Sequence, residues 1–183
     1  MIDPKILETK FIRPALKHIA QFDDRLYNEV IIDLLMGTAA QESNLGTYLT
    51  QIHGPAITVF QIEPQTHESI WQHYLSKPSK RKLSRLMADL APQESVKWAD
   101  GIVGGVVIAI EPWALYDMRY ASAFARLVYW PKTEPLPAKG DIEGYAKYWD
   151  RHYNANPDKG FPSEFINKWK MYLSDWKSDA TTG

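Results

Sequence analysis

Apolar side chains recur at every third or fourth position along most of this chain, a spacing that predicts helices with one buried face. The clearest stripe predicts a helix from Asp23 or Asp24 to about Glu42, and its members are Leu26, Val30, Ile31, Leu34, Leu35 and Thr38. Small residues near the end of this helix would let another segment pack closely against it, and they are Gly37, Ala39 and Ala40. Further helices are predicted at 66–75, 79–90, 112–129, 141–153 and 163–177.

The segments between these helices contain turn-forming or β-prone residues. A loop or a short hairpin is predicted at 43–58, and it leads into a short β-prone segment, Val59 to Ile62. The apolar run 101–110 fits either a strand or a buried helix. Together these elements predict a single, mainly α-helical domain, 1–183, with a small β element and a frayed tail at 178–183.

The composition excludes several classes of function. The 183 residues include no cysteine, which rules out disulfides, thiolate metal sites and cysteine nucleophiles. Lys and Arg number 21 and Asp and Glu number 22, a balance that argues against a nucleic-acid coat or a polybasic membrane anchor. The longest apolar run is much shorter than the ~20 residues of a membrane span. Charged residues near Met1 also predict that the chain has no export signal.

Glu42 is the most informative candidate for chemistry. It lies at the predicted C-terminal end of an apolar helix, where the helix dipole is negative and the flanking residues are apolar or small. Both effects raise the pKa of a carboxyl group, as a general acid requires. The alternative is an ordinary exposed acid at a helix end, which is where most acids occur. Gln61, 19 positions later, offers an amide that is able to bind an acetamido group as donor and acceptor.

Three short motifs in order resemble the soluble lytic transglycosylase and goose-type lysozyme superfamily. They are Glu42-Ser43, then Phe60-Gln61-Ile62 with Pro64 and Thr66, then Arg151-His152-Tyr153-Asn154. The helix at 120–125 resembles the family's central helix, and the whole pattern looks most like phage-encoded members. The chain departs from the family at Thr58, where glycine is usual. The resemblance implies an α+β, lysozyme-like fold with a small β element beside a catalytic cleft.

The resemblance also implies a role for each matched residue. Glu42 would be the catalytic acid and base, and Tyr153 would orient it. Ser43 would hold that carboxyl group or the substrate, and Asn154 would contact an N-acetyl group. The substrate-binding set implied in this way is Ser43, Gln61, Ile62, Tyr120, Tyr153 and Asn154. No cofactor or metal is implied.

Glu63 leaves two interpretations open. It is able to serve as a second carboxylate that activates water, as in an inverting hydrolase. It is equally able to pair with a base or to cap the helix after Pro64, and this structural interpretation is the favoured one.

Two other features invite a functional interpretation. His67-Glu68 begins like a zinc-protease helix, but Trp71 occupies the position of the second histidine, which argues against a metal site. The basic run formed by Lys77, Lys80, Arg81, Lys82 and Arg85 is a solvated helix face or a surface that attracts an anionic envelope or wall polymer.

The resemblance implies a phage enzyme that degrades the cell wall. Its expected partner is the peptidoglycan strand, which it would cleave at the β-1,4 bond between N-acetylmuramic acid and N-acetylglucosamine as a lytic transglycosylase. The alternatives are a hydrolytic muramidase of the same fold and a virion protein that binds without cleaving. No nucleic-acid partner or stable membrane insertion is expected. Without an export signal, the chain would reside in the host cytoplasm before release to the wall, or travel in the virion.

Overall fold

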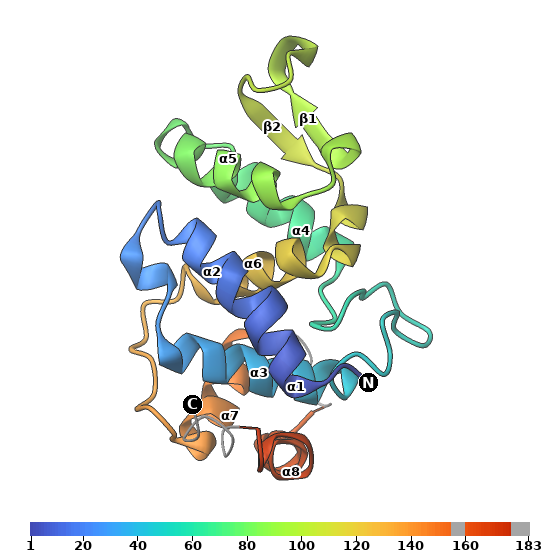
Figure 1. The fold of residues 1–183 in the computed structure, drawn as a ribbon, viewed down its shortest axis with the longest axis vertical. Helices are drawn as coiled ribbons and strands as arrows, with labels where there is room; N and C mark the ends of the chain where they lie inside the picture. Colours follow the sequence, from blue (N-terminus) through green and yellow to red (C-terminus); the bar gives the residue numbers. More distant parts are fainter. Residues whose placement is uncertain (155–159, 177–183) are drawn as a thin grey trace.

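The computed structural model describes residues 1–154 and 160–176, and it is mainly helical, as predicted (Figure 1). The principal elements are α1 (Pro4–Ile6), α2 (Arg13–Ile19), α3 (Glu29–Ser43), α4 (Pro64–Ile70), α5 (Arg81–Leu90), β1 (Val96–Trp98), β2 (Val107–Ile110), α6 (Met118–Tyr129), α7 (Ile142–His152) and α8 (Pro162–Leu173). The β1–β2 hairpin lies at one end of the molecule, and α7 and α8 lie at the other (Figure 1). None of the helices in the described ranges is long and apolar enough to span a bilayer. The predicted frayed tail, 178–183, lies outside the described residues.

Helix α6 is the central element of the core. Its residues from Tyr120 to Leu127 are all buried, and α2, α3, α4 and α5 pack around it. Alternate positions of the helix carry alanine, at 121, 123 and 125, which allows the neighbouring helices to approach closely. The Pro112 end of the predicted helix is a separate 3₁₀ turn, Pro112–Tyr116, because Asp117 caps α6.

Two helix boundaries differ from the prediction. The helix that ends near Glu42 begins at Glu29 and not at Asp23, because the Asn28 side chain caps it by accepting a hydrogen bond from the Ile31 amide at 2.9 Å. The N-terminal stretch, which includes α1 and α2 joined by a π-helical segment, Leu7–Ile12, was not predicted as helix. Proline at position 14 disfavours a continuous helix, because it has no amide hydrogen to donate. The π-helical segment just before it accommodates this missing donor.

Helices α3 and α8 make the closest helix pair near the candidate site. A Cβ atom at Gly37 would lie 2.3 Å from the Phe165 ring and 2.9 Å from the Trp169 ring. Only glycine therefore permits this approach, and the predicted close packing against the small residues of α3 is confirmed.

The strand structure agrees with the prediction in one segment and differs in another. Strand β2 lies within the apolar run 101–110, for which a strand was one of the two interpretations. Strands β1 and β2 pair antiparallel, with Val96 opposite Ile110, far along the chain from the β-prone segment at 59–62. That segment is a tight turn closed by an isolated bridge between Ile57 and Ile62. The predicted strand beside the cleft is therefore wrong. The left-handed backbone of Thr58 and Gln61, with φ of 71° and 46°, turns the chain back instead of extending it.

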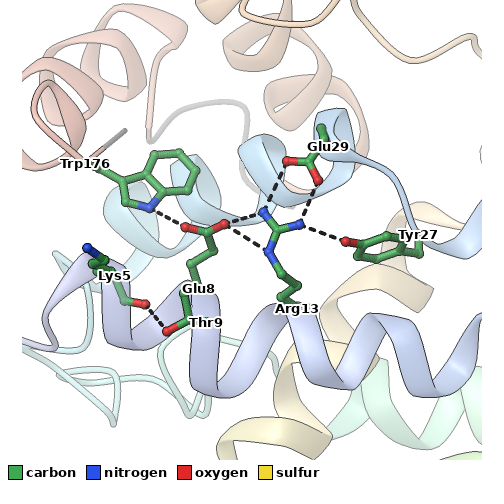
Figure 2. Close-up of polar contacts among 7 residues, drawn as sticks. All are labelled: Lys5, Glu8, Thr9, Arg13, Tyr27, Glu29 and Trp176. Atoms are coloured by element: carbon green, nitrogen blue, oxygen red, sulfur yellow. Dashed lines mark hydrogen bonds and ion pairs between the residues drawn. The ribbon is translucent and has the colours of Figure 1, made fainter. Parts of the chain in front are cut away.

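Arg13 joins the N-terminal helical stretch to α3 and to the segment after α8 (Figure 2). Its guanidinium donates to Glu29 Oε1 and to the Tyr27 hydroxyl, both at 2.7 Å, and it also pairs with Glu8. The second oxygen of the Glu8 carboxylate accepts a 2.8 Å hydrogen bond from the Trp176 indole. These contacts raise the pKa of Arg13 further above its usual range, so the cation is permanent.

Replacing Arg13 with Met is expected to lower the free energy of unfolding by about 1–3 kcal/mol, because Glu8 and Glu29 lose the cation that they share in a partly buried site. Urea unfolding followed by circular dichroism measures this change. The control is Lys97→Met, which removes an ion pair with Glu111 in which both side chains are exposed, and it should leave the midpoint unchanged. Equal midpoints for Arg13→Met and the wild type would contradict the prediction.

Candidate active site

The C-terminal end of α3 turns sharply just after Glu42. Asn44, Leu45 and Gly46 all have positive φ, and the Asn44 amide bonds back to the Ala40 carbonyl oxygen. The Ser43 hydroxyl donates to the Val59 carbonyl oxygen at 2.7 Å and accepts from the Gly46 amide at 2.8 Å. Ser43 is thus buried and ties the helix end to the following turn. Its hydroxyl bonds backbone groups, which differs from the expectation that it holds the Glu42 carboxyl group or the substrate.

The turn at 57–62 forms the neighbouring wall. The Gln61 amide nitrogen donates to the Thr58 carbonyl oxygen at 2.8 Å and to the Tyr48 carbonyl oxygen at 3.3 Å. Thr58 is buried with φ of 71°, a conformation that costs a β-branched residue about 1–2 kcal/mol. The backbone here therefore has the shape that glycine favours, although threonine occupies the position.

A cavity of about 420 Å³ opens between these segments and the C-terminal helices. The first wall comes from the end of α3 and the chain that follows it, with Gln41, Glu42, Gln51, Ala56, Gln61, Ile62, Glu63 and Thr66. The second wall comes from α6, α7 and the region of α8, with Val128, Trp149, Tyr153, Asn154, Gly160 and Glu164. All three predicted motifs thus contribute residues to one hollow.

Glu42 lies mostly buried in the wall of this cavity. Its Oε1 atom accepts a hydrogen bond from the Trp149 indole at 2.8 Å. Burial raises the pKa of the Glu42 carboxyl group to about 7, although the Trp149 hydrogen bond and the Lys168 charge act in the opposite direction. The alternative of an exposed helix-end acid does not describe this residue, since its carboxyl group is desolvated and specifically bonded.

Trp149 is a residue of the candidate site that the sequence analysis did not single out. It is buried on α7, one helical turn before Tyr153, so it lies on the same helix face as the third motif. A Cβ atom at Gly160 would come within 2.8 Å of the Trp149 ring, so only glycine allows the chain to pass this close. The four-residue spacing from Tyr153 is the signal that points to Trp149 in the sequence.

Lys168 of α8 contacts the C-terminal end of α3. Its ammonium group donates to the Gln41 carbonyl oxygen at 2.6 Å, which places a cation at the negative end of the helix. Partial burial lowers the pKa of Lys168, while the nearby charges of Glu164 and Glu42 raise it. Lys168 was also missed, because nothing in the sequence links α8 to Glu42.

Tyr153 and Asn154 lie in the cavity wall, but their hydrogen bonds differ from the expectation. The Tyr153 hydroxyl donates to the Phe60 carbonyl oxygen at 2.8 Å, so the residue that bonds Glu42 is Trp149 and not Tyr153. The Asn154 amide nitrogen donates to the Gly160 carbonyl oxygen at 3.0 Å. Tyr153 therefore connects α7 to the turn at 57–62, and Asn154 holds the chain that presses on Trp149.

Tyr120 lies in the core and not in the cavity. It has no exposed surface, and its hydroxyl accepts a 2.9 Å hydrogen bond from the Trp71 indole and bonds His67 Nε2 at 2.7 Å. The expectation that Tyr120 binds the substrate is therefore corrected. Burial also lowers the pKa of His67 to about 4, so this histidine is neutral near neutral pH.

Four side chains of the cavity wall bear on the chemistry that the cavity allows. Gln61 and Ile62 lie in its wall, as expected, and so does Glu63. Glu164, at the start of α8, adds a carboxylate that the sequence analysis did not single out. No group of three or more His, Asp or Glu side chains in 1–154 and 160–176 is placed to hold a metal ion.

Comparisons of the chain with protein-family models, with curated proteins and with solved structures found no match.

Replacing Glu42 with Gln is expected to stabilise the protein by roughly 2–3 kcal/mol at pH 8. The pKa of Glu42 in the folded protein, about 7, lies above the ordinary glutamate value of 4.5. The folded state therefore binds more protons than the unfolded state between these two values, and wild-type stability falls as the pH rises through that window. The neutral amide removes this loss and keeps an oxygen for the Trp149 indole.

Urea unfolding at several pH values from 4 to 8 measures the effect. The matched control is Glu94→Gln, which changes an exposed carboxylate outside the cavity and should retain the wild-type pH dependence. A constant difference between Glu42→Gln and the wild type across the range would contradict the raised pKa.

Proposed function

We propose that the chain is a lytic transglycosylase that cleaves the β-1,4 bond between N-acetylmuramic acid and N-acetylglucosamine in peptidoglycan. The observation that carries the proposal is the single desolvated carboxyl group of Glu42, held by one indole N–H in the wall of a cavity of about 420 Å³. Such a group is half protonated near pH 7, which is the state that a general acid needs at neutral pH.

In the first step the Glu42 carboxyl group donates its proton to the glycosidic oxygen. The bond from the muramyl C1 atom to that oxygen breaks, and the N-acetylglucosamine side leaves with a hydroxyl group. Glu42 is then a carboxylate, and the Trp149 hydrogen bond stabilises its negative charge. Trp149 acts as a positioning residue, since it contacts Glu42 and not the reacting bond.

In the second step the Glu42 carboxylate accepts the proton of the muramyl C6 hydroxyl group as that oxygen attacks C1. The product is a 1,6-anhydro ring, and Glu42 returns to its protonated form. Because the nucleophile belongs to the substrate, one carboxyl group suffices, and its proximity supplies much of the rate.

Recognition of the acetamido groups is assigned to the amide side chains of the wall. The Gln61 amide nitrogen is bonded to backbone oxygens, so its carbonyl oxygen is left to accept an N–H from the sugar. The cavity wall combines several such polar groups with apolar surface from Ile62 and Val128, which is typical of ligand sites.

The second candidate is a hydrolytic muramidase. It is favoured by the two further carboxylates in the wall, Glu63 and Glu164, either of which is able to activate a water molecule. The nature of the product distinguishes the two reactions. The resemblance to phage-encoded members makes a bacteriophage wall-degrading enzyme, acting at lysis or carried in the particle, the setting that we propose for either reaction.

Digestion of purified peptidoglycan is expected to yield 1,6-anhydromuramyl ends, which mass spectrometry detects by the loss of one water relative to reducing ends. Glu42→Gln should fold and lose at least about 10³-fold in rate, because it removes the only acid and base of the proposed mechanism. Glu94→Gln is the control and should retain full activity.

Reducing ends in place of anhydro ends would assign the muramidase reaction. No cleavage by the wild type would leave a role in binding alone. Equal cleavage rates for Glu42→Gln and the wild type would show that Glu42 is not the catalytic acid.

Replacing Trp149 with Phe is expected to move the alkaline limb of the pH profile of kcat/KM to higher pH and to lower kcat by roughly tenfold. The wild-type limb should lie near pH 7, because activity falls as Glu42 loses its proton. The indole N–H favours the carboxylate, so its removal raises the pKa of Glu42 further.

Initial rates on soluble glycan fragments at several pH values give this profile. Trp113→Phe, an exposed tryptophan outside the cavity, is the matched control and should leave the limb in place. A lower kcat with an unmoved limb would show that Trp149 has only a packing role.

A further inference from the structure

The β1–β2 hairpin carries exposed apolar side chains at its tip. Ile102 is 63% exposed and Val103 is 76% exposed, and Val106 and Ile108 are also largely exposed. The segment from 101 to 110 has no charged residue. Exposure of a continuous apolar stretch to water is unfavourable, so this tip indicates a docking surface.

Two cations of the basic run noted in the sequence, Arg81 and Arg85, lie next to the hairpin. Lys80 and Lys82 of the same run contact another part of the molecule, around Gln21 and Phe22. Residues 77–85 contain five cationic side chains and no acidic one. Helix α5, which begins at Arg81, packs against β2, and Figure 1 shows the two elements side by side at one end of the molecule. The chain has a net charge of −1, but the segment 77–85 has a local excess of positive charge.

Arg85 connects the basic helix to the hairpin. Its guanidinium lies over the Trp98 ring, 4.9 Å from the centroid, and donates to the Gly105 carbonyl oxygen at 3.3 Å. Asp89 is the acidic partner of Arg85, at a long 3.7 Å. The hairpin tip and α5 thus form one unit in which apolar and cationic groups have fixed relative positions.

A hollow of about 140 Å³ lies between the cationic helix and the base of the tip. Its lining includes Arg81 and Arg85 from α5, together with Gly105 and Val106 from the hairpin. Arg81 has no ion-pair or hydrogen-bond partner among the described residues. A guanidinium group that has no partner within the described residues and lies next to an apolar surface is able to bind a phosphate group.

We propose that this end of the molecule, the hairpin tip together with Arg81 and Arg85, docks onto an anionic phospholipid bilayer. Ile102 and Val103 enter the boundary between headgroups and acyl chains, Trp98 lies at the headgroup level, and Arg81 binds a lipid phosphate. Arrangements of apolar side chains flanked by cations bind anionic membranes through both apolar burial and electrostatic attraction.

The combination of the two kinds of side chain favours a bilayer over other partners. An anionic wall polymer would bind the cations but leave the apolar tip in water. A second copy of the chain would cover the apolar tip but bring two cationic helices together, which like-charge repulsion opposes. The hairpin lies at the opposite end of the molecule from α7 and α8, which form part of the candidate active site, so docking would leave the cavity open (Figure 1).

Vesicle flotation tests the proposal. The wild-type protein should float with vesicles of phosphatidylglycerol and phosphatidylethanolamine in equal parts, and bind vesicles of phosphatidylcholine at least tenfold more weakly. The double variant Ile102→Asp, Val103→Asp should lose at least tenfold in affinity for the anionic vesicles. Arg81→Gln should lose about fivefold. Binding of the wild type should weaken between about 0.1 M and about 1 M salt.

Matched controls place the same chemical changes elsewhere. Met171→Asp alters a 70% exposed apolar residue on α8, and Lys10→Gln removes an exposed cation near the N-terminus, and both should bind as the wild type does. Glu42→Gln should also bind normally, which separates this surface from the proposed catalysis. All variants change exposed or cavity-facing groups, and circular dichroism verifies that they are folded.

Three results would overturn the proposal. The first is no flotation of the wild type with anionic vesicles at low salt. The second is equal flotation of the wild type and the Ile102→Asp, Val103→Asp variant. The third is a wild-type dimer in light scattering that this variant converts to a monomer, since the tip would then be an interface between copies of the chain.

Discussion

The hydrogen bond from the Trp149 indole to the Glu42 carboxyl group is the interaction on which the candidate site depends. Burial alone would keep Glu42 protonated over a wide pH range, and an open cleft would leave it ionised. The indole and the Lys168 charge oppose the burial, and the result is a pKa of about 7. Three helices must meet for this balance to exist, because Glu42 belongs to α3, Trp149 to α7 and Lys168 to α8.

Glycine at two positions allows these three helices to pack closely together. Gly37 lets the Phe165 ring of α8 approach the backbone of α3, and Gly160 lets the chain before α8 press on the Trp149 ring. The Asn154 amide fixes this second contact by its hydrogen bond to the Gly160 carbonyl oxygen. The third motif therefore acts on Glu42 indirectly, by holding the residue that holds the carboxyl group.

The sequence predicted the parts of this site that local patterns control. The position of Glu42 at a helix end and the helix at 141–153, capped by Asp141, follow from periodicity and capping. The partner of Glu42 did not follow, because a bond between positions 42 and 149 is set by packing and not by any local signal. Tyr120 was misplaced for the same reason, since its apolar helix carries it into the core beside His67.

The surrounding structure holds the backbone of Thr58 in a left-handed conformation. A β-branched residue with φ of 71° persists only where other contacts determine the backbone. Three such contacts converge on the turn, since Ser43 bonds the Val59 carbonyl oxygen, Gln61 bonds that of Thr58, and Tyr153 bonds that of Phe60. Each of these bonds comes from one of the three sequence motifs. The three motifs are therefore joined through the backbone of one turn. Their hydrogen bonds hold that backbone in the conformation that glycine favours, although the residue is threonine.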